Sequence, residues 1–221
     1  TFNDKHNLDL LIGTSWNKEQ FRATTVTAND FASDVITIPL GSVTSTGVEL
    51  ESGLLSYFGR VNYNYDDIFL LSASLRRDES SKFGIRSGVF PGISAGINLH
   101  NLGVLPENGL IDTFKIRGGY GELGNSAIEP YLFVPSVNTS IPTTLGGDVL
   151  TFGSVVLPAD PNLTWETAQS VDFGIDIELL DRALTFSANY FKKKTDNLFA
   201  QLSPPPSSGQ TFENGASANL T

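Results

Sequence analysis

No cysteine and no methionine occur in the sequence of 221 residues, and the only histidines are His6 and His100. Without cysteine the chain forms no disulfide, no Cys-ligated zinc or iron–sulfur site and no thiol nucleophile. Two histidines are too few for a multi-histidine metal centre. We therefore expect no metal and no cofactor in this chain.

Basic residues and long apolar runs are scarce as well. Lys and Arg total 14 against 24 Asp and Glu, and this net charge of −10 argues against a nucleic-acid partner, which needs a basic face. No apolar run approaches the roughly 18 residues of a spanning helix, and residues 1–10 lack the features of a signal peptide. Because the sequence starts and stops within strand-like patterns, we expect an internal segment of a longer protein.

Glycine (21) and phenylalanine (15) are plentiful, and apolar and polar side chains alternate over long stretches. In residues 57–65, Tyr57, Val61 and Tyr63 fall on one face, and Arg60 and Asn62 fall on the other. Alternation with a period of two residues predicts β-strands. The predicted strands are 57–65, 71–76, 89–98, 114–121, 165–178 and 184–190, with weaker candidates at 7–16 and 214–221.

The connections between these strands differ in length. Asp66-Asp67 and the segment near Asp181 predict tight turns, and 99–113 is a medium connection on the same side. Long structureless loops are uncommon in compact soluble domains but normal on the extracellular rim of outer-membrane barrels. The predicted long loops, rich in Gly, Ser, Thr, Asn and Pro, are 17–52, 78–88, 124–164 and 192–213.

Alternation alone also suits a soluble β-sandwich. Three features favour a membrane barrel: strands of about 10 residues, aromatic residues near strand ends on the apolar face, and a charged opposite face that suits a water-filled lumen. We therefore predict an all-β fold of antiparallel transmembrane β-barrel strands with long extracellular loops. The predicted lumen-facing residues are Arg60, Asn62, Arg76, Lys115, Arg117, Asp172 and Asp176.

Three motifs resemble catalytic or cofactor sites. The glycine pattern of residues 118–124 lacks the helix that a dinucleotide site needs. Ser94 in "GISAG" lies inside an alternating strand, whereas a nucleophile elbow needs a strand-to-helix turn. Asp172 and Asp176 are about 13 Å apart on one strand face, too far for a glycosidase pair. We therefore expect no catalytic residue and no enzyme.

Several blocks occur in order along the chain: "GTSWNKEQ", "LLSYFGRVNYNYDD" with "LLSASLRRDESSKFG", "GVFPGISAGINL", "FKIRGGYGELGN", "PNLTWETAQSVDFGIDIELLDRALTFSANYFKKKTDNL" and "SGQTFENGASAN". Together they resemble the SusC/RagA-type TonB-dependent transporters of Gram-negative outer membranes. The resemblance implies a barrel of 22 strands with an N-terminal plug and a TonB box. It also implies a SusD-like lipoprotein lid and an oligosaccharide or peptide cargo.

On this resemblance, residues 1–221 are a fragment of a TonB-dependent receptor β-barrel domain, about eight strands, with the plug domain and TonB box absent. The implied partners are the SusD-like lipoprotein, TonB, the rest of the barrel, outer-membrane lipid and the cargo. The implied location is the outer membrane of a Gram-negative bacterium. Two alternatives stay open: a siderophore or vitamin receptor of the same barrel type, and a soluble β-sandwich that serves in adhesion or carbohydrate binding.

Overall fold

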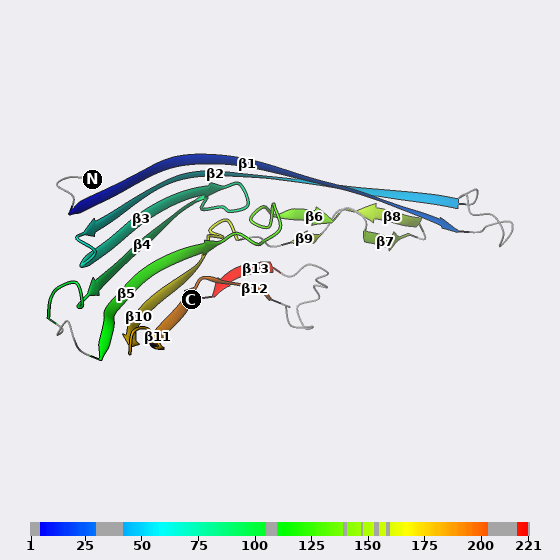
Figure 1. Cartoon of the computed structure of the whole chain (residues 1–221). Coiled ribbons are helices and arrows are strands. Elements are labelled where there is room, and N and C mark those ends of the chain that lie inside the picture. Colours follow the sequence, from blue (N-terminus) through cyan, green and yellow to red (C-terminus); the bar gives the residue numbers. More distant parts are fainter. Residues whose placement is uncertain are drawn as a thin grey trace, which may run out of the picture.

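A single antiparallel sheet of seven strands dominates the fold (Figure 1). The computed structural model describes residues 5–29, 42–104, 110–138, 141–146, 148–152, 155–157, 160–202 and 216–220. The strands of this sheet lie side by side in the order of the sequence, and the sheet forms a curved wall. Its strands, in spatial order, are β1 (His6–Asn29), β2 (Ser42–Tyr65), β3 (Phe69–Ser80), β4 (Ser87–Asn98), β5 (Ile111–Asn125), β10 (Glu166–Leu179) and β11 (Leu184–Asp196).

Three short hairpins accompany the main sheet. Two of them lie within the connection between β5 and β10, and the third follows β11. None of the residues that the structure describes belongs to a helix long and apolar enough to cross a membrane. The hairpins pair β6 (Ser136–Asn138) with β9 (Val155–Leu157), β7 (Ile141–Leu145) with β8 (Asp148–Phe152), and β12 (Leu198–Leu202) with β13 (Ala216–Leu220).

The predicted tight turns are confirmed by the backbone. Asp66 and Asp67 both adopt positive φ, 51° and 53°, as the two central residues of a type I′ hairpin turn require. The Asn64 side chain accepts a hydrogen bond from the Asp67 amide at 3.0 Å. At the other turn, Asp181 and its two neighbours also have positive φ. Short polar side chains tolerate this conformation, which explains the aspartates.

The predicted loop 17–52 is wrong over most of its described length. The weak candidate strand at 7–16 continues as β1 to Asn29, and its partner β2 already begins at Ser42. Prediction failed because polar residues dominate both faces of this ribbon, so alternation of apolar and polar residues gives no signal there. The other predicted long loops contain strands too: β6 to β9 lie within 124–164, and β12 lies within 192–213.

The candidate strand at 214–221 exists as β13, but it pairs with β12 and not with β11. Asn197, which has a positive φ of 56°, separates β11 from β12. β13 therefore pairs with β12, the strand that follows β11 in the chain, and does not extend the seven-stranded sheet.

The register sorts side chains into two faces. Leu10, Val61, Ala73, Ile93 and Tyr120 form one row across five strands. One position along each strand, polar residues form the neighbouring row on the opposite face, because successive side chains alternate. We call these the apolar face and the polar face. The polar row contains Asp9, Asn62, Ser72, Ser94, Gly119 and Asp172.

The apolar face is open to its surroundings. In the part of the chain that the structure describes, no second sheet covers it, as a β-sandwich would require. Such a contiguous exposed apolar surface is foreign to soluble monomers and suits lipid. Its exposed side chains include Leu8, Leu10, Ile12, Trp16, Tyr57, Val61, Leu71, Leu75, Val89, Ile93, Val171, Phe173, Leu184, Phe186 and Tyr190.

The height of the apolar face fits a bilayer. On β1 its positions run from His6, opposite Tyr65, to Trp16, opposite Leu55. These residue steps, about ten at about 3.4 Å each, span about 34 Å along the strand and about 24 Å along the membrane normal at a tilt of about 45°. Barrels carry an apolar band of about 25 Å. Residues 18–29 and 42–53 extend past this band, and we call them the projecting ribbon.

A small core lies where the loop between β3 and β4 and the segment before β10 fold onto the polar face, and we call it the loop-side core. Phe83, Phe90, Leu163 and Trp165 are buried there, and the rings of Phe83 and Trp165 lie 4.8 Å apart. The Trp165 indole donates a hydrogen bond to the Arg86 carbonyl at 3.0 Å. This contact ties the loop between β3 and β4 to the segment before β10. The loops at this end are therefore anchored to the wall.

The two faces of β11 predict opposite results for one substitution. Phe186 lies on the apolar face and Phe191 on the polar face, and both are well exposed. Phe186→Arg should weaken insertion by about 2–4 kcal/mol if the residue is at the bilayer midplane, and Phe173→Arg should do the same. Phe191→Arg should assemble normally. The yield of folded full-length protein in the outer membrane measures the difference, and normal assembly of Phe173→Arg and Phe186→Arg would contradict the face assignment.

Candidate functional site

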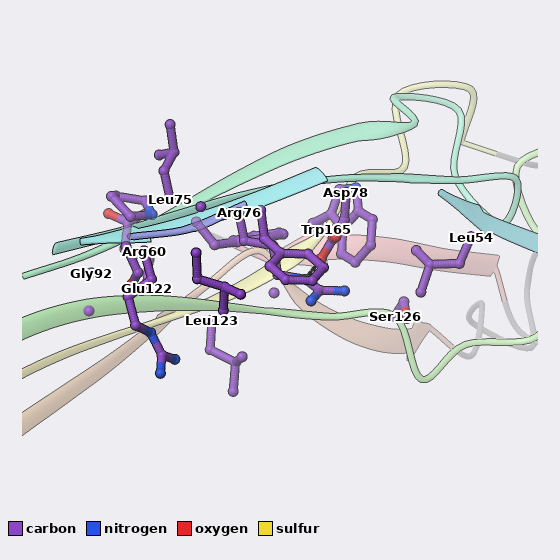
Figure 2. A pocket seen from close by; sticks show the side chains of 18 residues that line it. Leu54, Arg60, Leu75, Arg76, Asp78, Gly92, Glu122, Leu123, Ser126 and Trp165 are labelled. Atoms are coloured by element: carbon purple, nitrogen blue, oxygen red, sulfur yellow. Dashed lines mark hydrogen bonds and ion pairs between the residues drawn. The ribbon is translucent and has the colours of Figure 1, made fainter. Parts of the chain in front are cut away.

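The polar face carries a hollow of about 730 Å³ below the loop-side core (Figure 2). The Arg60 and Leu75 side chains extend from opposite faces of the sheet, as the register requires. The residues that shape the hollow include Arg60, Ser74, Arg76, Asp78, Gly92 and Trp165.

Small residues make the floor of this hollow. Ser74, Gly92 and Gly121 face one another across β3, β4 and β5. A Cβ atom at Gly92 would stand 2.8 Å from the Ser74 hydroxyl oxygen, so a larger residue is not accommodated there without movement. A Cβ atom at Gly121 would meet nothing within 4 Å. The missing side chains therefore leave open space over the sheet.

Arg76 and Asp78 form a fixed ion pair at the loop-side wall of the hollow. The Arg76 Nε lies 2.8 Å from Asp78 Oδ2, and its Nη2 donates to the Ser56 hydroxyl at 2.8 Å. The guanidinium also lies over the ring of Phe58. Asp78 is 7% exposed, and its Oδ1 has no hydrogen-bond partner among the described residues. Arg76 therefore neutralises a carboxylate that is almost wholly buried.

A second polar network crosses three strands nearer the short turns. Arg117 Nε donates to Asp176 Oδ2 at 2.9 Å, and the Ser187 hydroxyl donates to Asp176 Oδ1 at 2.8 Å. Arg117 also donates to the Asn189 side chain. Gly174 lies between these groups, where a Cβ atom would be 2.8 Å from the Arg117 Cζ atom. The network links β5, β10 and β11 and requires a glycine at its centre.

All seven residues predicted to face a lumen lie on the polar face, in separate groups. Arg60 and Arg76 line the large hollow. Asn62, Lys115 and Arg117 line a second hollow of about 300 Å³. Asp176 binds Arg117 directly, and Asp172 lies four residues away on the same face of β10. That the face lines a lumen remains a prediction.

Sequence reasoning missed two features of this region. Trp165 was expected to begin the apolar face of a strand, but β10 starts at Glu166 and Trp165 is only 4% exposed in the loop-side core. Asp78 was expected in a loop, whereas it ends up as a buried partner of Arg76 near the end of β3. The "RRDES" run signals ion pairing, but no local pattern shows which carboxylate is buried.

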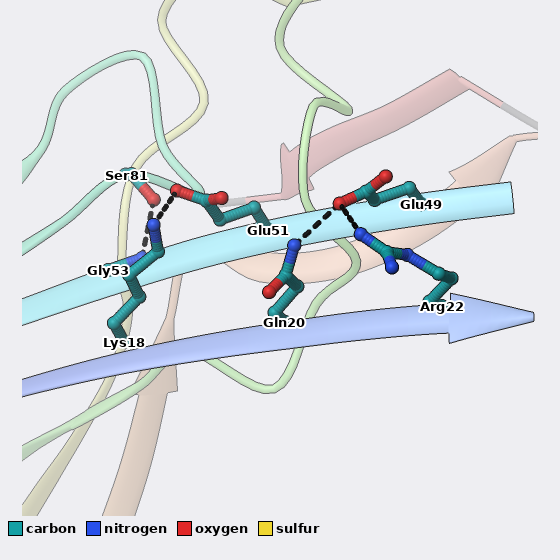
Figure 3. A network of polar contacts seen from close by, with 7 residues as sticks. All are labelled: Lys18, Gln20, Arg22, Glu49, Glu51, Gly53 and Ser81. Carbon is teal, nitrogen blue, oxygen red and sulfur yellow. Dashed lines mark hydrogen bonds and ion pairs between the residues drawn. The ribbon is translucent and has the colours of Figure 1, made fainter.

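Ion pairs cover the outward side of the projecting ribbon (Figure 3). Lys18 lies 2.7 Å from Glu51, and Arg22 lies 2.9 Å from Glu49. Gln20 donates a second hydrogen bond to Glu49. The hydrogen bond from Arg22, followed by the one from Gln20, lowers the pKa of the Glu49 carboxyl. These side chains share the face that is apolar further down the strands.

No group of three His, Cys, Asp or Glu that could hold a metal ion comes together within the described residues. The arrangement offers cations, carboxylates and amides on a solvent-accessible wall. Such a surface can bind and sort polar solutes.

Comparison with known proteins adds the decisive observation. The family model described as "TonB dependent receptor-like, beta-barrel" matches residues 1–220. The chain belongs to this family. TonB-dependent receptor P3 of Formosa agariphila is 32% identical over 212 residues, which cover 92% of this chain and 21% of that protein. TonB-dependent receptor SusC of Bacteroides thetaiotaomicron is 28% identical over 165 residues, 72% of this chain and 16% of that protein.

Solved structures of this type share the fold. A structure of the RagAB peptide transporter matches 100% of this chain and 24% of that chain, with a TM-score of 0.78 and 23% identity. The RagAB peptide importer in its closed-closed state matches 99% and 24%, with a TM-score of 0.80 and 22% identity. The resemblance to SusC/RagA-type proteins is thereby confirmed. The chain spans about a fifth of the length of TonB-dependent receptor P3.

The Arg76–Asp78 and Arg117–Asp176 ion pairs should contribute differently to the free energy of unfolding. Arg76→Met should cost about 1–3 kcal/mol of unfolding free energy, because it leaves the buried Asp78 carboxylate unpaired. Arg117→Met should cost less than about 1 kcal/mol, because that pair is more exposed. Denaturant unfolding of the full-length protein in detergent measures both values. Equal losses would contradict the burial of Asp78 as the cause.

The Glu49 ladder should respond to acid. Since its folded pKa is lowered, the carboxylate stabilises the ribbon fully above the ordinary pKa of 4.5, and this stabilisation is lost as pH falls through the folded pKa. Amide hydrogen exchange at residues 18–22, corrected for intrinsic rates, should therefore accelerate between pH 5 and pH 3. The Glu49→Gln variant should show no such change, and equal acceleration in both proteins would exclude Glu49 as the cause.

Proposed function

We propose that this chain forms part of the barrel wall of a TonB-dependent transporter that imports nutrient oligomers across the outer membrane of a Gram-negative bacterium. The observation that carries the proposal is the sheet with one exposed apolar face of bilayer height and one charged face. Family membership supports it. The apolar face contacts lipid, and the polar face lines the lumen.

The open edges of the sheet support a larger assembly. β1 and β11 are the edge strands, and a membrane cannot satisfy their unpaired backbone groups. Further strands of the same barrel therefore pair with them, in a barrel of 22 strands. In this proposal TonB acts through a plug and TonB box supplied by other parts of the protein, and the wall residues make or break no bond.

The cargo class that we propose is an oligosaccharide or a peptide. Among similar proteins, one is named SusC and others are structures of a peptide transporter, RagAB. These likenesses favour an oligomer importer over the alternative, a siderophore or vitamin receptor.

The projecting ribbon indicates where a SusD-like lipoprotein lid would bind. On its inward side, which continues the polar face, Phe21 is 59% exposed and Val48 is 51% exposed. Phe21 pairs with Leu50, and Val48 pairs with Ala23. Glu19 lies beside this apolar group on the same side, whereas the ion pairs occupy the outward side. A two-stranded ribbon is marginally stable alone. We infer that the lid covers this apolar group on the inward side of the ribbon.

Two matched substitutions test the lid contact. Val48 and Val26 belong to the same ribbon and are similarly exposed, but Val48 faces inward and Val26 faces outward. Val48→Asp should weaken lid binding at least tenfold, because a charge would be buried in the interface. Val26→Asp should leave it within about threefold. Affinity of the full-length transporter for its lid measures both, and equal effects would place the lid elsewhere.

The proposed function itself is tested by uptake. Cells with the full-length transporter should accumulate a labelled peptide or oligosaccharide mixture in the periplasm, and this uptake should disappear when TonB or the transporter gene is deleted. Uptake that survives both deletions would contradict the proposal.

A further inference from the structure

Among the residues that the structure describes, Arg60 has no hydrogen-bond or ion-pair partner. Each of Arg22, Arg76, Arg77, Arg117 and Arg182 lies within ion-pair distance of a carboxylate. Arg60 is exposed and makes no hydrogen bond or ion pair with any residue that the structure describes. Arg86 also lacks a carboxylate, but it lies in the loop between β3 and β4 and does not line the hollow.

The surroundings of Arg60 leave room for a bound group. In the cross-strand row Leu11, Arg60, Ser74, Gly92 and Gly121, three small residues follow Arg60 on the next three strands. The hollow above them measures about 730 Å³, within the usual range of ligand pockets of about 300–1,000 Å³. It is much larger than one carboxylate needs.

No nearby carboxylate neutralises this site. Asp9, the closest by register, lies opposite Asn62 and forms no ion pair with Arg60 in the described structure. Asp78 and Glu122 line the same hollow, but Asp78 is paired with Arg76, and the Glu122 carboxylate accepts a hydrogen bond from the Tyr120 hydroxyl. In the described part of the wall, Arg60 is therefore the one arginine without a carboxylate partner, and its planar guanidinium matches a carboxylate or sulfate.

We propose that Arg60 binds an anionic group of the cargo, so that the transporter prefers oligomers that carry carboxylates or sulfates. This inference rests on the proposed import function and adds the chemical class of the substrate. A carboxylate from the plug could occupy the same place, and the experiment separates the two occupants.

The experiment uses the full-length transporter and two matched probe pairs. One pair is a glutamate-rich peptide and its glutamine counterpart, and the other is an oligogalacturonate and its methyl ester. Binding to the purified transporter and TonB-dependent uptake are both measured for the wild type, Arg60→Gln, Arg60→Lys and Arg77→Gln. Arg77 is the control because it lies on the apolar face beside Tyr57 and is already paired.

We expect the wild type to prefer the anionic member of at least one pair. Arg60→Gln should reduce that preference at least tenfold, Arg60→Lys should retain part of it, and Arg77→Gln should leave it unchanged. A preference that is absent, or unaffected by Arg60→Gln, overturns the inference. Equal losses for charged and neutral probes also overturn it and indicate a plug contact. Uptake that does not depend on TonB, with the binding preference still sensitive to Arg60, would instead overturn the proposed function.

Discussion

The strand register is the constraint on which the rest of this structure depends. Side chains alternate along each strand, so a slip of one residue would exchange the two faces. With the observed register, Leu10, Val61 and Ile93 share one face, while Asn62 and Asp172 share the other. The tight turn of residues 66–68 fixes this register between β2 and β3, because a three-residue loop leaves little slack. Local turn chemistry thereby decides which side chains share the apolar face.

The same constraint determines where polar networks form. Arg117 reaches Asp176 and Asn189 because neighbouring strands present these residues on one face. Glycine at position 174 then provides the space that the guanidinium occupies. Likewise, Ser74 and Gly92 open the hollow beside Arg60 because the register aligns small residues side by side. Binding surfaces on such a wall thus arise from cross-strand rows and not from sequence-local motifs.

The sequence predicted the fold where the two faces differ chemically. The alternation over residues 57–65, 114–121 and 184–190 identified the second half of β2, β5 and β11, and it placed Arg60 and Arg117 on the polar face. It could not identify the projecting ribbon, because Lys18 and Glu51 occupy a face that is apolar elsewhere. Nor could it identify the burial of Asp78 or Trp165, since that depends on loops that meet only in three dimensions. The alternation of residues thus predicts which face a side chain lies on. The buried residues of the site depend on contacts between segments that are far apart in the sequence.

Ion pairing distinguishes two kinds of arginine on the polar face. Arg76 is held by Asp78, by the Ser56 hydroxyl and by the ring of Phe58, so its orientation is fixed before any solute arrives. Arg60 has none of these contacts and stays solvated, which an exposed cation tolerates at little cost. A cation of the first kind shapes the wall, because moving it would uncover a buried carboxylate. A cation of the second kind can exchange its water for an incoming anion, because no carboxylate of the described wall holds it and the small residues beside it leave space.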